Sequence, residues 1–203
     1  VASGHKVPQA YLGLAEIATR EGRLVEAEAG YRRAVTASDD RIADARSGLG
    51  VLLVRMGRQQ EAKPELQRAL ELDDDNWPAH YGLARLHLAA GAWDRARAEL
   101  EHGRACRGVL EGEDKYQYGQ ALLRLGTGDL PGAETAAVAA LQLNPTDTEY
   151  GALVARIYQQ QGKPDLAIQA YEQALAAQGM PRTAPLMHQL GNLYRADQRF
   201  DDA

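Results

Sequence analysis

Small and bulky apolar residues recur along this chain in a fixed order on either side of a glycine. After each glycine, alanines and one larger residue follow at spacings of four and then three, as in Ala27, Tyr31 and Ala34. This spacing places the three residues on one face of a helix, where the alanines allow a neighbouring helix to approach closely. The equivalent sets are Ala62, Leu66 and Ala69; Ala96, Leu100 and Gly103; Ala133, Ala137 and Ala140; and Ala167, Tyr171 and Ala174.

The segment before each glycine has its own signature, a bulky residue followed by a small one. Examples are Leu49-Gly50 and Leu83-Ala84, whereas the fourth copy departs from the pattern with Gln120-Ala121. A period of about 34 residues built from two helices predicts an all-α solenoid rather than a domain with one central core. The turn residues that define the period are Gly22, Gly57, Gly91, Gly128, Gly162 and Gln198.

The pattern also predicts where each helix begins and ends. The first helix of each pair (the A helix) precedes the turn glycine, and the second (the B helix) follows it. We expect A helices near 8–21, 43–56, 77–90, 114–126, 148–161 and 184–196, and B helices near 24–37, 59–71, 93–106, 130–142 and 164–177.

The repeat resembles that of the tetratricopeptide repeat (TPR) family, with five full copies and part of a sixth. The segment from Ala140 to Pro145 is similar to the repeat ends of that family. The resemblance implies a right-handed superhelical solenoid of antiparallel helix pairs. Residues 1–7 would be an N-terminal linker or tag remnant, followed by one continuous array at 8–203. The repeats would span about 8–41, 43–76, 77–110, 114–147, 148–181 and 184–203.

Composition narrows the range of partners. The net charge of −5 argues against nucleic acid as the main ligand, which would favour clustered Lys and Arg. No apolar run approaches the ~18 residues of a spanning helix, so direct membrane insertion is not expected. The cysteine count does not determine the cellular compartment, because one cysteine, Cys106, cannot form an internal disulfide. The chain lacks an initiator Met and ends at Ala203, so we expect a fragment continued by further repeats or a capping helix.

The chemistry-bearing side chains predict neither catalysis nor a cofactor. His80 and His87 lie two helical turns apart, about 10 Å, which is too far to chelate one ion, and a packing role is favoured. Arg104 and Arg107 could lower the pKa of Cys106, but without a catalytic partner the thiol is interpreted as structural. We therefore expect no catalytic residue, no metal site and no cofactor.

Three other segments are interpreted as parts of the repeat. Gly126–Gly132 lacks the Lys-Ser/Thr of a phosphate-binding loop and fits the turn of repeat four. Asp73–Asp75 lacks the pattern of a calcium loop and is expected to cap the next helix. The junction at 107–113 is longer than the others, which indicates either a tolerated loop or a change of superhelical angle.

The family resemblance implies that the A helices line a concave groove. Several residues at groove positions are apolar, and exposed apolar surface rimmed by charge typically marks a contact site. The alternative is that these residues pack against a neighbouring B helix, or against a terminal helix folded into the groove. Glu149 also occupies a position that faces the groove in this family. The predicted groove residues are Val51, Val54, Tyr81, Arg85, Leu88, Tyr118, Leu122, Leu125, Arg156, Gln159, His188, Asn192 and Arg195.

The leading hypothesis is a non-catalytic scaffold that binds a protein or peptide with apolar anchors and some negative charge. An adaptor for chaperone tails is disfavoured, since Leu12, Glu16 and Ser47 stand where that subtype has Lys and Asn. One alternative is a repeat region of a larger bacterial machine for polysaccharide export, pilus or secretion assembly, or sugar transfer, in the periplasm or cytoplasm. Another is self-association, in which the convex B-helix face of one solenoid packs on the groove of another.

Overall fold

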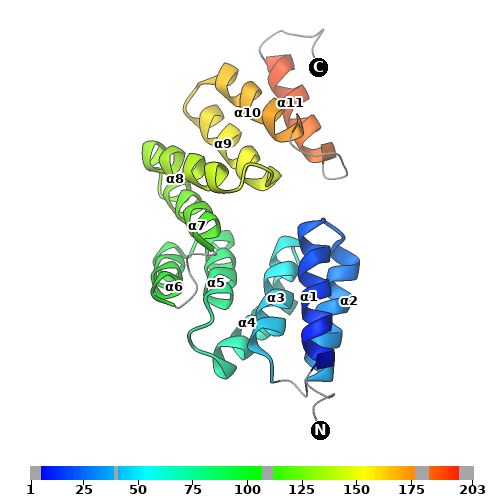
Figure 1. Cartoon of the computed structure of the whole chain (residues 1–203). Coiled ribbons are helices and arrows are strands. Elements are labelled where there is room, and N and C mark those ends of the chain that lie inside the picture. Colours follow the sequence, from blue (N-terminus) through cyan, green and yellow to red (C-terminus); the bar gives the residue numbers. More distant parts are fainter. Residues whose placement is uncertain (1–5, 39–40, 107–111, 177–182, 197–203) are drawn as a thin grey trace. The chain divides into compact units, whose positions relative to one another are not determined.

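The computed structural model describes residues 6–38, 41–106, 112–176 and 183–196, and the regular structure in these ranges is helical (Figure 1). Each expected helix is found, with both ends within two residues of the prediction. The all-α fold is therefore confirmed. The helices are α1 (Lys6–Arg20), α2 (Leu24–Ala37), α3 (Ala43–Arg55), α4 (Gln59–Leu72), α5 (Trp77–Ala89), α6 (Trp93–Ala105), α7 (Glu113–Gly126), α8 (Leu130–Leu143), α9 (Thr148–Gln160), α10 (Pro164–Ala176) and α11 (Thr183–Ala196).

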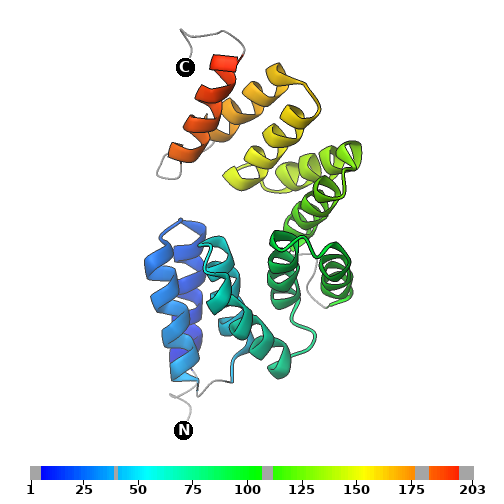
Figure 2. The same ribbon diagram turned by 180° about the vertical axis from the view of Figure 1, so that it is seen from behind.

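Consecutive helices pack as the A and B members of one repeat. α1 packs with α2, α3 with α4 and α5 with α6, and the same holds for α7 with α8 and α9 with α10 (Figures 1 and 2). Each B helix also contacts the next A helix within its unit, as α2 does with α3 and α8 with α9. None of the helices in the described ranges is both long and apolar enough to cross a bilayer.

The turns between A and B helices depend on glycine. Gly22, Gly57, Gly91, Gly128 and Gly162 all have positive φ, between 68° and 84°. Residues with a Cβ are disfavoured in this left-handed region, which explains the recurrence of glycine at the period of the repeat. The sixth expected turn residue, Gln198, lies outside the described residues.

The alternation of small and bulky residues produces close helix contacts. The first signature alanine of each B helix is fully buried: Ala27, Ala62, Ala96, Ala133 and Ala167 are 0% exposed. Leu66 shows how a bulky residue is accommodated, because it lies against Gly50 of α3 and Gly82 of α5. A Cβ on either glycine would lie 2.5 Å from a Leu66 side-chain carbon.

The chain divides into two compact units, Val1–Gly112 and Glu113–Ala203. The N-terminal unit contains α1 to α6, and the C-terminal unit contains α7 to α11. The boundary falls in the long junction at 107–113, in a chain that the sequence predicts to be one continuous array.

Two local expectations are changed by the structure. Asn76, rather than one of the three preceding aspartates, caps α5 by accepting a hydrogen bond from the backbone N–H of Ala79. The first helix begins at Lys6, inside the segment assigned to a linker. The Gly126–Gly132 segment forms the turn between α7 and α8 as predicted, with Asp129 capping α8 through the N–H of Gly132.

Candidate functional site

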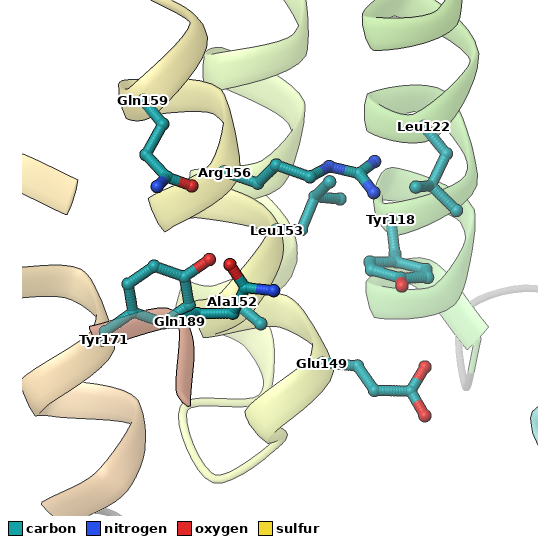
Figure 3. Close-up of a pocket in the computed structure, with 9 residues that line it drawn as sticks. All are labelled: Tyr118, Leu122, Glu149, Ala152, Leu153, Arg156, Gln159, Tyr171 and Gln189. Atoms are coloured by element: carbon teal, nitrogen blue, oxygen red, sulfur yellow. The ribbon is translucent and has the colours of Figure 1, made fainter. Parts of the chain in front are cut away.

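A pocket of about 320 Å³ opens on the C-terminal unit between helices α7, α9, α10 and α11 (Figure 3). Most of its lining comes from α9, where spacings of three and four residues place the side chains on one face. The lining residues are Tyr118, Leu122, Glu149, Ala152, Leu153, Arg156, Gln159, Tyr171 and Gln189.

The floor of the pocket is apolar and well packed. Tyr118, Leu153 and Tyr171 are each less than 10% exposed. Above this floor, the side chains of Arg156 and Gln189 are exposed. The pocket therefore combines an apolar base with polar groups at its rim, which is the usual composition of a small ligand site.

Charge is distributed unevenly along α9. Glu149 lies in the first turn of the helix, and Arg156 follows seven residues later, about 10 Å along the axis. Figure 3 shows the Arg156 side chain extending past Leu153 toward α7, whereas Glu149 lies at the other end of the pocket. No carboxylate in the described ranges forms an ion pair with Arg156.

The charge of Arg156 extends to the pocket floor. Burial raises the pKa of the Tyr171 hydroxyl, and the positive charge of Arg156 opposes part of that rise. Tyr171 is therefore a neutral phenol that can donate or accept a hydrogen bond at physiological pH. Arg156 supplies the pocket's positive charge.

Aromatic stacking holds α7 and α9 in register beneath the pocket. The Tyr118 and Tyr150 ring centroids are 4.9 Å apart, and the Tyr150 hydroxyl donates a 2.9 Å hydrogen bond to Asp114. On the other side, α9 approaches α10 closely because Gly151 faces Ala174, where an added Cβ would lie 2.7 Å from the alanine Cβ. These contacts join α7 to α9 and α9 to α10.

Only some of the predicted groove residues meet in this pocket. Tyr118, Leu122, Arg156 and Gln159 line it, together with Glu149. Four residues that the sequence suggests as exposed apolar anchors are instead 6–9% exposed: Tyr81, Leu88, Tyr118 and Leu125. These four side chains are therefore buried in the helix packing, and Tyr118 also contributes to the pocket floor.

The remaining predicted residues lie elsewhere. Val51 and Val54 pack against the core of the N-terminal unit, and Arg85 is half-buried on α5. On α11, His188 and Arg195 are exposed, and Arg195 donates a hydrogen bond to Asn192. The neighbouring residue Gln189 lines the pocket instead. Sequence reasoning also missed Ala152 and Leu153, and it assigned Tyr171 only to repeat packing.

The structure also brings together three side chains that no sequence motif links. Ligand atoms of His80, Glu99 and His102, on α5 and α6 of the N-terminal unit, lie within 4.8 Å of one another. His80 Nδ1 is 2.7 Å from Glu99 Oε2, and the two imidazole centroids are 5.6 Å apart. His102 therefore has a neighbour that its sequence context does not reveal.

Cys106 does not have the environment of a reactive thiol. Burial raises the pKa of the Cys106 thiol, and Asp75 and its acidic neighbours raise it further. Its S–H group donates to the carbonyl of His102. The lowering of its pKa by adjacent arginines is therefore wrong, and its structural role is supported.

Comparison with known proteins now identifies the family. Tetratricopeptide repeat sequence models match residues 6–75, 53–107 and 154–203. The chain belongs to the tetratricopeptide repeat family. Members of this family act as scaffolds for interactions between proteins, and this is the general class of role that the fold supports. A search of curated protein sequences gives no match.

Solved TPR structures share the fold at low sequence identity. A thermophilic TPR protein of Thermus thermophilus matches with a TM-score of 0.71 and 18% identity, over 92% of this chain and 98% of that one. PilF of Pseudomonas aeruginosa matches with a TM-score of 0.62 and 18% identity, over 98% and 89%. YrrB, a TPR protein with an unusual peptide-binding site, matches with a TM-score of 0.50 and 20% identity, over 88% and 89%. At these identities the likeness shows the fold alone.

Proposed function

We propose that this TPR protein is a non-catalytic scaffold that binds a peptide segment of a partner in the pocket of the C-terminal unit. The observation that carries the proposal is the placement of Arg156. Its guanidinium stands at the rim of an apolar pocket without a carboxylate partner in the described part of the chain. An arginine in this setting is suited to a ligand carboxylate, because its fork of N–H donors matches the two oxygens.

The pocket's size and chemistry define the segment. A volume of about 320 Å³ accommodates one or two side chains rather than a folded element. An apolar side chain would lie over Leu153 and Leu122, and an adjacent Asp, Glu or terminal carboxylate would meet Arg156. Gln159 and Gln189 would hydrogen-bond the peptide backbone, since their amides both donate and accept.

Glu149 gives the peptide a direction. A second acidic residue beside Glu149 would be repelled, whereas a Lys or Arg there would be attracted. The preferred segment therefore carries its acidic residue at the Arg156 end and a neutral or basic residue about 10 Å away. A peptide bound with this polarity differs from one that is attracted only by its overall negative charge.

Existing contacts hold the pocket in shape before binding. The Tyr118–Tyr150 stack and the Tyr150–Asp114 hydrogen bond order α7 against α9. A rigid site loses less conformational entropy when it binds, which is how a small pocket can hold a short peptide.

The experiment is a selection of random peptides displayed on phage against the whole chain. Enriched sequences would be synthesised and measured by fluorescence polarisation against wild type, Arg156→Ala and Arg33→Ala, the last removing an exposed arginine on α2. We expect an apolar–acidic consensus whose affinity falls at least tenfold in Arg156→Ala and is unchanged in Arg33→Ala. Peptides that bind both variants as well as wild type would overturn the assignment of the pocket.

A further inference from the structure

We propose that His80, Glu99 and His102 form a binding site for a divalent transition metal ion, with zinc as the expected occupant. The site lies between α5 and α6 of the N-terminal unit and is separate from the peptide pocket. Two imidazoles and one carboxylate are a donor set that zinc prefers, and three protein ligands leave a position for water or an external ligand.

The helix pair positions all three groups. Glu99 and His102 are three residues apart on α6, so they project from one face, and His80 faces them from the antiparallel helix α5. Gly103 permits the approach, because a Cβ at this position would lie 3.3 Å from the His80 Cβ. Alanine occupies the equivalent position in the other B helices, at Ala34, Ala69, Ala140 and Ala174.

The distances suit a metal after a small adjustment. Zinc bonds of about 2.0–2.2 Å at tetrahedral angles separate ligand atoms by roughly 3.4 Å. The three ligand atoms lie within 4.8 Å of one another, and His80 Nδ1 and Glu99 Oε2 are closer, at 2.7 Å. An ion would replace the proton between His80 and Glu99, and the two groups would move slightly apart while His102 moves in.

A backbone carbonyl supports the ligand role of His80. Its other nitrogen, Nε2, lies 3.3 Å from the carbonyl oxygen of Asp74. With Nε2–H donating to this carbonyl, Nδ1 is left as the unprotonated, ligating nitrogen. This arrangement is typical of metal-bound histidines, whose second N–H is held by a carbonyl or carboxylate. The His80 side chain is 12% exposed and that of Glu99 is 22% exposed, while His102 is exposed at the surface.

The preceding repeat has different side chains at the positions equivalent to the three proposed ligands. Arg46, Glu65 and Arg68 precede His80, Glu99 and His102 by 34 residues each. Arg46 forms an ion pair with Glu65, and Arg68 pairs with Glu71, whose counterpart in the next repeat is Ala105. Guanidinium groups cannot ligate a metal, because they offer no lone pair at neutral pH. Histidines at both arginine positions therefore supply metal ligands that the preceding repeat lacks.

The test is titration of the whole, chelator-treated chain with Co²⁺ and Zn²⁺ at pH 7.5, using cobalt absorption and calorimetry. We expect one ion per chain, tetrahedral-type cobalt bands that zinc abolishes, and a rise in Tm with zinc. The variant His80→Arg/His102→Arg copies the preceding repeat and should fold while losing at least about tenfold in affinity. Glu99→Gln should also weaken binding.

Three controls make the test selective. His87→Ala and His188→Ala remove histidines outside the cluster, and Cys106→Ser removes the single thiol. All three should keep wild-type affinity. Equal binding by wild type and the double arginine variant, or loss of binding in any control, would overturn the site.

Discussion

Tyr118 of α7 and Tyr150 of α9 stack with ring centroids 4.9 Å apart and an interplanar angle of 31°. They lie 32 residues apart in sequence and belong to successive repeats. The pair links the two A helices that supply most of the pocket lining. One aromatic contact thus connects repeat packing to the geometry of the proposed binding site.

Loss of the Tyr150 hydroxyl should loosen this link. Tyr150→Phe keeps the stacked ring but removes the 2.9 Å hydrogen bond to Asp114. A hydrogen bond to a charged group contributes about 1.5–3 kcal/mol, so we expect the free energy of unfolding to fall by about 1–2 kcal/mol. Urea denaturation would measure the change. Tyr11→Phe on α1 serves as the matched control. An equal loss of unfolding free energy in both variants would show that the hydrogen bond to Asp114 does not stabilise the fold.

The close approach of helices at Gly82 predicts that stability is sensitive to an added methyl group at this position. Alanine normally stabilises a helix interior by about 1 kcal/mol relative to glycine. At Gly82, however, a Cβ would lie 2.5 Å from Leu66, which is 0% exposed and is also confined by Gly50. We expect Gly82→Ala to destabilise the chain by about 1–3 kcal/mol.

Gly13 is the control for this prediction, because a Cβ there meets nothing within 4 Å. Gly13→Ala on α1 should raise the free energy of unfolding by up to about 1 kcal/mol. Thermal or urea unfolding compares the two variants directly. Stabilisation by both substitutions would mean that Leu66 is not tightly held between α3 and α5.

Glu28 predicts a pH dependence in the N-terminal unit. Burial alone would raise the pKa of the Glu28 carboxyl, but hydrogen bonds from Arg32 and Arg58 outweigh burial and lower it below 4.5. A lowered pKa in the folded state stabilises the protein above the unfolded value and loses this contribution as pH falls through the folded value. Wild type should therefore exceed Glu28→Gln by about 0.5–1 kcal/mol at pH 7, and the difference should shrink below about pH 4.5.

The control for Glu28 is Glu26→Gln. The Arg23–Glu26 pair has side chains that are 46% and 63% exposed, so solvent screens it and its removal should leave stability essentially unchanged. Denaturant unfolding from pH 3 to pH 8 would give both curves. A gap between wild type and Glu28→Gln that persists or widens in acid would contradict the assignment.

The sequence predicts the helices well because its signals are local. A glycine at φ of 78°, such as Gly57, and a fully buried alanine five residues later, such as Ala62, recur at the repeat period. The burial of a groove residue, in contrast, depends on neighbouring helices and not on the nearby sequence. Tyr81 and Leu88 occupy predicted groove positions, yet both are buried. Helical spacing gives the direction in which a side chain points, but not how much of it other side chains cover.

The cluster of His80, Glu99 and His102 is not predicted from the sequence, for a related reason. His87 lies seven residues after His80 on the same helix, whereas the spatial neighbours of His80 are Glu99 and His102 on the antiparallel helix. The signal was nevertheless present in the repeat alignment. Arg46 and Glu65 occupy the positions equivalent to His80 and Glu99 and carry opposite charges. This indicates a contact between the two helices, which His80 and Glu99 make in the third repeat.

Arg156 is proposed to meet the carboxylate of a bound peptide, and a double-mutant cycle tests this contact most directly. Affinities of the selected peptide and its Asp/Glu→Ala analogue would be measured for wild type and Arg156→Ala. We predict a coupling free energy of about 1–3 kcal/mol between the two groups. Additive effects, with no coupling beyond about 0.3 kcal/mol, would contradict the proposed contact.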